Sequence, residues 1–501
     1  MNNNILGISA GFHDAALSVV DGNNGRILFA SHSERFSRQK NDKRVCNTIV
    51  DEAMRYGDIK SIAYYENHWL KKFRMLRAGQ KIADWNWTLR GELNQHFPGK
   101  MGLLDNARLV SYGHHKSHAA AGFQTSPYDN ATVVVIDAVG EFQTASIWSA
   151  YYNNNGDAVY RLKWQMRYPN SIGMFYSAFT NLVGLRPMDE EYILMGMAAY
   201  GNRLNVQQTI ENDVIESYEP LRFKDNLHIG LDYLYSATKF DIAAATQDMV
   251  EDMIMRVINK AADFDKTGNL VYGGGVALNC SANRWLGNAF KNIWIMPSPG
   301  DAGSSLGAAA LEYGKKLQWE NAFLGKNISG KYPVDKIMHE LYTNKIVGVA
   351  NGRAEFGPRA LGNRSLLADP RGSTIKDNVN NIKKRQKFRP FAPVILEEYA
   401  QYNFRMPDGF ESSPYMQVTA RCNYPNEYPA IVHKDRTSRV QTVPNDGSGI
   451  RLLLERWYKE TGCPMLLNTS LNIRGEPMVN DNLDATRFEK HYGIKVFTSD
   501  K

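Results

Sequence analysis

Three β-rich runs, each leading into a loop of small residues, constrain the fold of this chain more than any other feature. The first two, Ile5–Gly22 and Thr132–Trp148, are typical of hairpins with a polar tip. The third, Leu270–Asn279, indicates a strand that runs through three glycines toward the start of a helix. Because such strands alternate with helical sequence such as Gln247–Ala262, the pattern predicts an α/β fold.

The order of these runs matches the two phosphate loops and the adenosine loop of actin-like ATPases, which is an analogy of fold. We therefore expect an actin-like domain over residues 1–335. Gly325, Gly330 and Pro333 break the periodicity near its end, and a second α/β domain is expected over residues 336–501. A chain of 501 residues is also longer than one hydrophobic core usually grows.

Composition and charge indicate the expected cellular compartment of the protein but do not identify a binding partner. The start of the chain shows no secretory signal, no apolar stretch approaches the length of a membrane span, and the four cysteines are widely separated. We expect a cytoplasmic protein with no membrane partner, and we consider a homodimer. The net charge of +7 fits either diffuse anion-binding sites or a nucleic-acid partner.

Two histidines four residues apart are the clearest signal for a metal. His114 and His118 enter an Ala-rich stretch that favours a helix, so their imidazoles share one face. Asp137 at a strand end and Asp301 in a Gly-rich turn could complete a His2Asp2 site for Fe(II), Mn(II) or Zn(II). The histidine pair alone would fit a packed helix as well, and the two carboxylates shift the balance toward metal.

His13, at the tip of the first predicted hairpin, is a candidate for taking a proton from a hydroxyl. A loop residue held by rigid strands can reach a substrate, and histidine accepts protons near neutral pH. A histidine that merely satisfies the turn is an equal alternative. Lys40 ends the basic run Glu34–Lys40, which is either a solvated helix face or the lining of an acceptor channel.

The glycine triplet offers a candidate anion contact. Gly274 and Gly275 allow the backbone to approach an anion closely, and the amides of the helix expected near Asn279 would face it. The alternative is an ordinary tight turn between a strand and a helix. Whether the N-terminal domain binds ATP through this loop stays open.

The densest cationic signal is the segment Gly352–Arg371, in which four arginines lie within 19 residues among Gly and Pro. Arginine forks bind phosphate oxygens with two parallel hydrogen bonds, and rigid turns hold them in place. Lys387 and Arg389 add two cations on a proline-stiffened segment, and Asn468–Arg474 adds amide, hydroxyl and guanidinium groups. These segments predict a pocket for phosphates.

Several of these strings resemble a known family. Glu355–Ser365, Phe388–Pro393 and Leu467–Asn472 are similar to strings of the O-carbamoyltransferases that decorate antibiotics and nodulation factors, as are His114–His118 and Gly300–Gly303. The resemblance spans nearly the whole chain.

The resemblance implies an actin-like domain that transfers a carbamoyl group to a hydroxyl at an Fe(II)-type site. It also implies a YrdC-like domain that makes a carbamoyl adenylate from carbamoyl phosphate and ATP, the latter with Mg²⁺. Carried over, the metal ligands are His114, His118, Asp137 and Asp301. The catalytic candidates are His13, Lys40, Arg359, Lys387 and Arg389, and the nucleotide-binding candidates are Gly274, Gly275, Asn279, Arg364, Arg439, Asn468, Ser470 and Arg474.

The acceptor hydroxyl is left open. The resemblance implies a small-molecule alcohol, whereas the basic balance and the aromatic and basic stretch His68–Arg74, with Trp85 and Trp87 nearby, favour a 5-hydroxymethylpyrimidine in DNA or as a nucleotide. Two alternatives are a relative of the tRNA threonylcarbamoyl transferases and an actin-like ATP-binding regulatory module. The second of these does not explain the arginine-rich strings.

Overall fold

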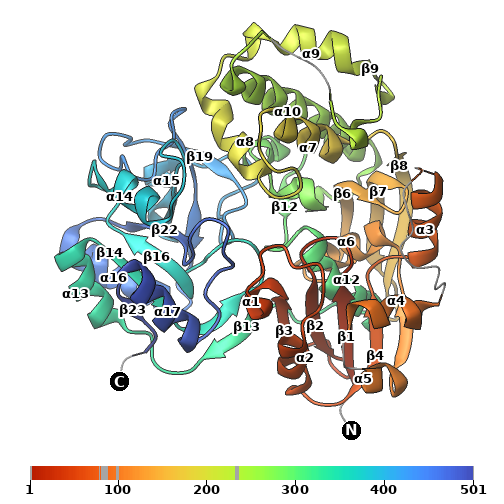
Figure 1. Ribbon diagram of the computed structural model, residues 1–501, viewed down its shortest axis with the longest axis horizontal. Coiled ribbons are helices and arrows are strands. Elements are labelled where there is room, and N and C mark those ends of the chain that lie inside the picture. Colours follow the sequence, from red (N-terminus) through yellow and green to blue (C-terminus); the bar gives the residue numbers. More distant parts are fainter. Residues whose placement is uncertain (1–2, 78, 80–87, 98–100, 232–235, 500–501) are drawn as a thin grey trace. The chain divides into compact units, whose positions relative to one another are not determined.

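The computed structural model describes residues 3–77, 79, 88–97, 101–231 and 236–499 (Figure 1). The chain divides into two compact units. Unit 1 comprises Met1–Ser33 and Asn41–Glu320, and unit 2 comprises Glu34–Lys40 and Asn321–Lys501. This division lies earlier in the chain than the predicted boundary after residue 335, and it assigns one short N-terminal segment to unit 2. No helix among the described residues is long and apolar enough to cross a membrane.

Unit 1 contains two five-stranded sheets that share one topology. In the first sheet the order is β3-β2-β1-β4-β5, where β1, β2 and β3 are antiparallel neighbours and β4 and β5 are added parallel to β1. The second sheet repeats this order as β8-β7-β6-β11-β12. The strands are β1 (Asn4–Ser9), β2 (Ala16–Asp21), β3 (Ile27–His32), β4 (Ile59–Tyr64), β5 (Arg108–Ser111), β6 (Asn130–Gly140), β7 (Gln143–Tyr152), β8 (Ala158–Arg167), β11 (Asn269–Gly273) and β12 (Asn292–Trp294).

Each half of unit 1 is therefore an antiparallel meander followed by two parallel strands, and the chain runs through this pattern twice. Such a duplicated arrangement is that of an actin-like domain, so the predicted fold class is confirmed for this unit. Both hairpins expected from the sequence are present, as β1–β2 and β6–β7. The tip loop of the first hairpin carries His13, and β6 of the second carries Asp137.

Two helices, α6 (His114–Phe123) and α12 (Asp301–Tyr313), lie between the two sheets, where α12 packs on the first sheet and α6 on the second. A Cβ on Gly7 in β1 would lie 1.9 Å from the carbonyl oxygen of Ser305 in α12, so helix and strand touch through their backbones. A Cβ on Gly307 would likewise lie 1.8 Å from the carbonyl oxygen of Ser117 in α6. Because only glycine fits these contacts, the N-terminal ends of both helices are held in fixed positions.

The other elements of unit 1 surround these sheets. The α10 helix, which begins after the capping side chain of Thr238, is its longest described helix. The further elements are α2 (Asn47–Met54), α3 (His68–Arg77), α4 (Leu89–His96), α5 (Met101–Asp105), α7 (Ile172–Leu182), α8 (Glu191–Met197), α9 (Gln207–Val214), α10 (Lys239–Phe264), α11 (Cys280–Asn283), β9 (Ile215–Tyr218) and β10 (Leu221–Phe223).

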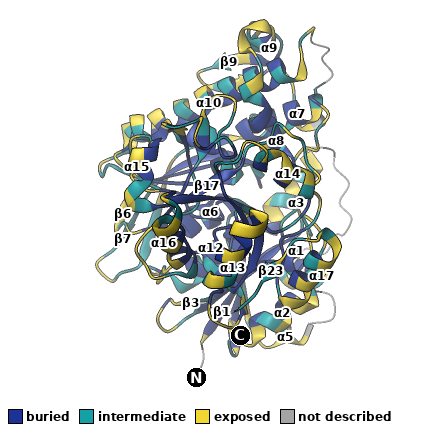
Figure 2. Cartoon of the chain, turned by 90° about the vertical axis from the view of Figure 1, so that its left-hand side faces the viewer, coloured by how far each residue is buried: buried dark blue, intermediate teal, exposed yellow. Residues whose placement is uncertain are grey.

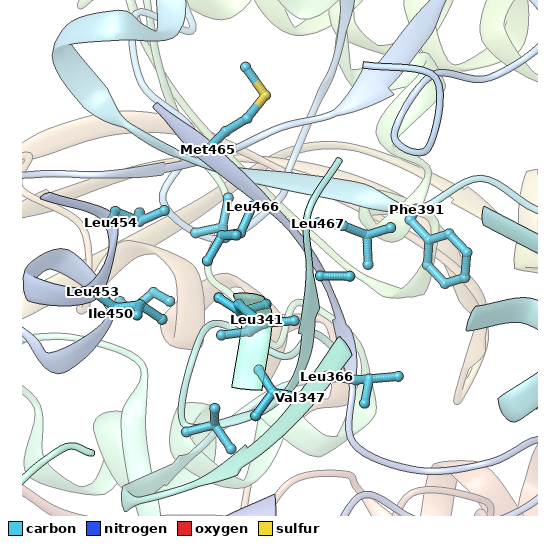
Figure 3. Close-up of a cluster of buried hydrophobic side chains, with 14 of the residues drawn as sticks. Leu341, Val347, Leu366, Phe391, Ile450, Leu453, Leu454, Met465, Leu466 and Leu467 are labelled. Atoms are coloured by element: carbon cyan, nitrogen blue, oxygen red, sulfur yellow. The ribbon is translucent and has the colours of Figure 1, made fainter. Parts of the chain in front are cut away.

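Unit 2 is built on a mixed six-stranded sheet with the order β21-β17-β22-β16-β14-β23. Its core packs Val347 and Leu366 of the sheet against Leu341 of α13 and Ile450 of α16 (Figure 3). The elements are α1 (Glu34–Ser37), β13 (Phe323–Ile328), α13 (Val334–Asn344), β14 (Ile346–Ala350), β15 (Gly352–Glu355), β16 (Arg364–Ala368), α14 (Ile375–Ile382), β17 (Ala392–Leu396), α15 (Ala400–Asn403), β18 (Phe404–Arg405), β19 (Thr419–Cys422), β20 (Thr437–Arg439), β21 (Gln441–Val443), α16 (Gly449–Thr461), β22 (Met465–Ser470), α17 (Asn482–Tyr492) and β23 (Val496–Phe497).

Burial follows this layering in both units. The central strands are buried throughout, whereas helices such as α13 and α17 have one exposed face (Figure 2). In α13 the buried positions Ile337, Met338 and Leu341 repeat at the spacing of one helix face. Unit 2 is thus an α/β domain with its own core, which agrees with the predicted fold class.

Candidate functional site

The four predicted metal ligands converge in unit 1. His114, His118, Asp137 and Asp301 are all buried, and one ligand atom from each lies within 4.8 Å of the others. The Nε2 atoms of the two histidines lie 3.1 Å apart, and Asp137 Oδ2 is 2.9 Å from one and 3.2 Å from the other. Asp301 Oδ1 completes the group at 3.5 and 3.3 Å from the same two nitrogens.

The two halves of unit 1 contribute two ligands each. In the first half, His114 is the first residue of α6 and His118 lies one turn later on the same face. In the second half, Asp301 is the first residue of α12, and Asp137 lies in β6 next to the point where the pairing with β7 shifts register. Equivalent parts of the duplicated fold therefore meet at this site.

Hydrogen bonds around the ligands orient them toward a common point. His118 Nδ1 lies 3.1 Å from the carbonyl oxygen of Pro299, which accepts a hydrogen bond from Nδ1–H in the tautomer that leaves the lone pair of Nε2 for a metal. Asp137 Oδ1 accepts hydrogen bonds from the backbone N–H groups of Ala138, at 2.8 Å, and Gly275, at 3.3 Å. Such support is what metal-binding histidines and carboxylates usually have.

The donor set fits a divalent cation. Burial alone would lower the pKa of His118, but hydrogen bonds and charges from Asp137 and Asp301 raise it to about 9. The same carboxylates raise the pKa of His114 against the effect of burial. Two imidazoles and two carboxylates held this closely are a ligand set that suits Fe(II), Mn(II) or Zn(II).

His13 lies beside this cluster, as the sequence predicts. Its Nε2 is 4.0 Å from Asp301 Oδ2, and its Nδ1 is 3.1 Å from Asp14 Oδ2. Burial lowers the pKa of His13, but the hydrogen bond that its ring donates to Asp14 and the charges of Asp301 and Asp137 raise it to about 9. A bound divalent cation would neutralise part of that negative charge. The side chain keeps 23% of its surface exposed, so a substrate can reach it.

The glycine loop supports the metal ligands. Gly274 has a φ of +88°, and a Cβ there would lie 2.2 Å from the carbonyl oxygen of Ile136, so glycine is required. The amide of Gly275 binds Asp137. Asn279 caps α11 through the amide of Ala282 and pairs with Gln247. These contacts place the loop at the candidate metal site, and its predicted contact with nucleotide stays a prediction.

In unit 2, the side chain of Arg364 holds the backbone around the arginine-rich loop through hydrogen bonds. It is fully buried, and its guanidinium donates to the carbonyl oxygens of Asn351, Asn480 and Lys326, among others. Glu355 Oε1 accepts hydrogen bonds from the backbone amides at 361, 363 and 364. This geometry favours a structural role for Arg364, and its predicted role in nucleotide binding stays a prediction.

Lys383 is a buried cation that the sequence analysis missed. Its Nζ contacts Ser470 and Asn472, with Asn472 contributing a backbone carbonyl at 2.8 Å and a side-chain oxygen at 3.1 Å. Burial and the neighbouring charges of Arg385 and Arg389 lower its pKa well below the usual range. In the sequence, the basic run Lys383-Lys384-Arg385 was the signal for this residue, since it lies just before the predicted phosphate-binding segment that begins at 387.

The remaining predicted phosphate ligands lie on loops and strand ends of unit 2. Asn468 is buried and bonds to the carbonyl of Ala360, while the backbone oxygens of 387 and 389 are held by Asn380. Lys40 also belongs to unit 2, where its Nζ lies 2.9 Å from Glu34 Oε2. Exposed or half-buried positions are occupied by Arg359, Lys387, Arg389, Arg439, Ser470 and Arg474.

The aromatic and basic stretch of α3 differs from a surface that tracks nucleic acid. Lys72 and Arg74 are buried, with 6% and 8% of their surface exposed, whereas Trp69 and Phe73 are 50% and 64% exposed. The cations of this stretch therefore face inward. Trp85 and Trp87 lie outside the described residues.

Comparison with known proteins settles the family. The family profile described as the carbamoyltransferase N-terminus matches residues 66–310, and the profile described as the carbamoyltransferase C-terminus matches residues 338–501. The chain belongs to the carbamoyltransferase family. The predicted family, and the prediction that this chain is a carbamoyltransferase enzyme, are thereby confirmed.

Relatives match over nearly the whole chain. An uncharacterized protein of Synechocystis is 32% identical, over 96% of this chain and 93% of its own length. Nodulation protein NolNO of Sinorhizobium fredii is 30% identical, over 94% and 76%, and the 3'-hydroxymethylcephem-O-carbamoyltransferase of Amycolatopsis lactamdurans is 27% identical, over 96% and 95%. A nucleotide-bound HypF structure aligns with 62% of this chain and 46% of its own, with a TM-score of 0.33 and 14% identity.

Proposed function

We propose that this carbamoyltransferase is ATP-dependent and transfers the carbamoyl group to an acceptor hydroxyl at the site of unit 1. The observation that carries the proposal is the convergence of His114, His118, Asp137 and Asp301 with His13 at their edge. In a member of this family, that arrangement combines a cation site with a group able to accept a proton.

In the transfer step, the hydroxyl oxygen of the acceptor attacks the carbamoyl carbon. The C–O bond to AMP breaks, AMP leaves with the bonding electron pair, and the hydroxyl proton passes to Nε2 of His13. Asp14 accepts a hydrogen bond from Nδ1 and holds the imidazole ring of His13 in place. A divalent cation held by the four ligands would polarise the carbamoyl oxygen. His13 serves as base in its neutral form.

We assign formation of the carbamoyl adenylate to unit 2. Carbamoyl phosphate, ATP with Mg²⁺ and one water would give carbamoyl-AMP, phosphate and pyrophosphate. Arg359, Lys387 and Arg389 would bind the phosphate groups, since all three are accessible on loops. Support comes from the buried scaffold of Glu355, Arg364 and Lys383, which fixes the loops that carry them.

The acceptor class that the comparisons favour is a small-molecule alcohol, since the cephem enzyme among the relatives is named for a hydroxymethyl acceptor. The net charge of +7 favours a second class, a 5-hydroxymethylpyrimidine in DNA or as a nucleotide. Because the cations on α3 face inward, this helix does not offer a basic surface along which a DNA strand could bind. Within this second class, a single nucleotide is therefore the better candidate.

The test is ATP/pyrophosphate exchange that depends on carbamoyl phosphate, followed by mass analysis of candidate acceptors in the same preparation. Exchange together with a gain of one carbamoyl group on small alcohols, or on hydroxymethylpyrimidine nucleotides or DNA, identifies the class. Absence of exchange in the metal-loaded full-length chain would contradict the proposed function.

A further inference from the structure

Helix α3 buries polar side chains and exposes aromatic ones, which is the reverse of an ordinary surface helix. Its buried side chains include His68, Lys72 and Arg74, which are 3%, 6% and 8% exposed. Its exposed side chains include Trp69 and Phe73, which are 50% and 64% exposed. A surface helix normally buries its apolar face, so the inward face of α3 is polar against the usual preference.

The cations on this inward face are not equally well paired with carboxylates. Lys72 Nζ lies 3.0 Å from Glu92 Oε2, and Lys71 forms an ion pair with Glu66. By contrast, Nε and Nη1 of Arg74 are buried and have no hydrogen-bond partner among the residues that the structure describes. Burial lowers the pKa of Arg74, and the charge of Glu66 offsets this only in part. A buried cation with unused donors is costly unless an anion binds it.

This inward face adjoins the transfer site. Glu66 Oε2 lies 4.0 Å from Nδ1 of the metal ligand His114. A Cβ on Gly11, two residues before His13, would lie 3.6 Å from Lys71 Nζ. Arg74 is one helical turn beyond Lys71, so the two cations share one side of α3.

Arg74 lies within electrostatic range of His228. Burial lowers the pKa of His228, and the charge of Arg74 lowers it further. His228 is an exposed residue, so the surroundings of Arg74 extend to the surface of unit 1.

We propose that unit 1 binds an oxyanion of the acceptor, a phosphate or a carboxylate, at Arg74 with Lys71 beside it. The anion would anchor the acceptor while its hydroxyl lies at His13. This inference rests on the proposed function in one respect, namely that the acceptor is carbamoylated in unit 1. It narrows the acceptor to alcohols that carry an acidic group.

The test compares Arg74→Met with Arg77→Met, a matched control because Arg77 is exposed on the same helix. Equilibrium dialysis of the full chain against labelled inorganic phosphate, and separately against acetate, counts the bound anions. We expect Arg74→Met to lose one anion per chain, or to bind it about tenfold or more weakly, because a charged hydrogen bond is lost. Arg77→Met should bind as the wild type does.

Arg74→Met should also unfold at a higher temperature than the wild type when no anion is present, because it removes an unpaired buried charge. Added phosphate or acetate should raise the Tm of the wild type more than that of the variant. Should Arg74→Met not fold, Arg74→Lys answers the question, since it keeps the charge but loses the fork and must still weaken binding.

The probe whose binding is lost identifies the chemical class of the anion. Loss of phosphate binding alone assigns a phosphate group, loss of acetate binding alone a carboxylate, and loss of both a general oxyanion site. Binding of both probes to Arg74→Met or Arg74→Lys at wild-type strength would overturn the inference. ATP/pyrophosphate exchange, measured on the wild type, decides the proposed function separately, because dialysis requires no turnover.

Discussion

The Nε2 atoms of His114 and His118 face each other at 3.1 Å, and both lie within 3.2 Å of the same oxygen of Asp137. Two imidazole nitrogens turned toward one carboxylate oxygen leave a point that a cation can occupy. Their positions follow from the four-residue spacing on α6, which places both rings on one face of the helix.

Removing one of these nitrogens should remove the metal. We expect His118→Ala to bind Fe(II) or Mn(II) about 100-fold or more weakly, because the loss of even a supporting residue around a metal ligand commonly costs ~10–100-fold. Metal content after dialysis and the transfer rate measure the effect. The matched control is His115→Asn, since His115 is buried on the same helix but bonds to Ser146. Equal metal loss in both variants would point to a general disturbance of α6.

Replacing the proposed base should slow transfer without emptying the metal site. We expect His13→Gln to lower the rate of carbamoyl transfer by about 10²- to 10⁴-fold, the usual contribution of a positioned general base. The measurement is carbamoylated acceptor formed per unit time at saturating metal. His491→Gln, at an exposed histidine of unit 2, should transfer at the normal rate. A His13→Gln enzyme as fast as the wild type would rule out this role.

The arginine-rich loop should be required for activation of the carbamoyl group. Arg359→Ala is expected to abolish ATP/pyrophosphate exchange that depends on carbamoyl phosphate, because it removes a fork for phosphate oxygens. Arg421→Ala, at an exposed arginine on β19 of the same unit, serves as the control and should exchange normally. Normal exchange in Arg359→Ala would show that other cations bind the phosphates.

The buried charges around α3 should make stability depend on acid pH. Burial raises the pKa of Glu92, but hydrogen bonds from His96 and Lys72 and the charge of Lys71 lower it to about 2. Since the folded-state pKa lies below the unfolded value of about 4.5, this carboxylate stabilises the fold above that pH and stops doing so as pH falls toward 2. The difference corresponds to about 3 kcal/mol at neutral pH.

Glu92→Gln should therefore lose stability at pH 7 and show a flatter stability profile between pH 5 and 2 in urea unfolding. The control is Glu216→Gln, because Glu216 is exposed on β9 and its replacement should leave the profile of the wild type unchanged. Parallel profiles for Glu92→Gln and the wild type would contradict the shift.

The candidate metal site could be predicted from sequence because its four residues lie where short-range rules apply. The spacing of His114 and His118 needs only a helix, and Asp137 and Asp301 follow strand-like and glycine-rich signals. Their convergence depends on the actin-like fold, which the three β-rich runs indicated. The basic run at 383–385 is visible in the sequence, but the burial of Lys383 is not, since it depends on Ser470 and Asn472, almost ninety residues later in the chain.

Long-range packing also decided the two features that the sequence left ambiguous. The basic run at 34–40 was compatible with a solvated helix, yet Arg38 donates to the carbonyl oxygens of Met478 and Pro477 and belongs to unit 2. The stretch at 68–74 gave no sign that its cations would face inward. Charged and aromatic residues alternate along it closely enough to fit either orientation, and only the partners Glu66 and Glu92 distinguish them.

The duplication within unit 1 would give a bound cation a role beyond chemistry. Each repeat supplies two of the four ligands: the first contributes the histidines of α6, the second contributes Asp137 and Asp301. An ion held in this way bridges the two repeats, so separating them would require breaking its bonds. Its affinity is then linked to the cohesion of unit 1, and chelation should loosen the whole unit rather than one loop.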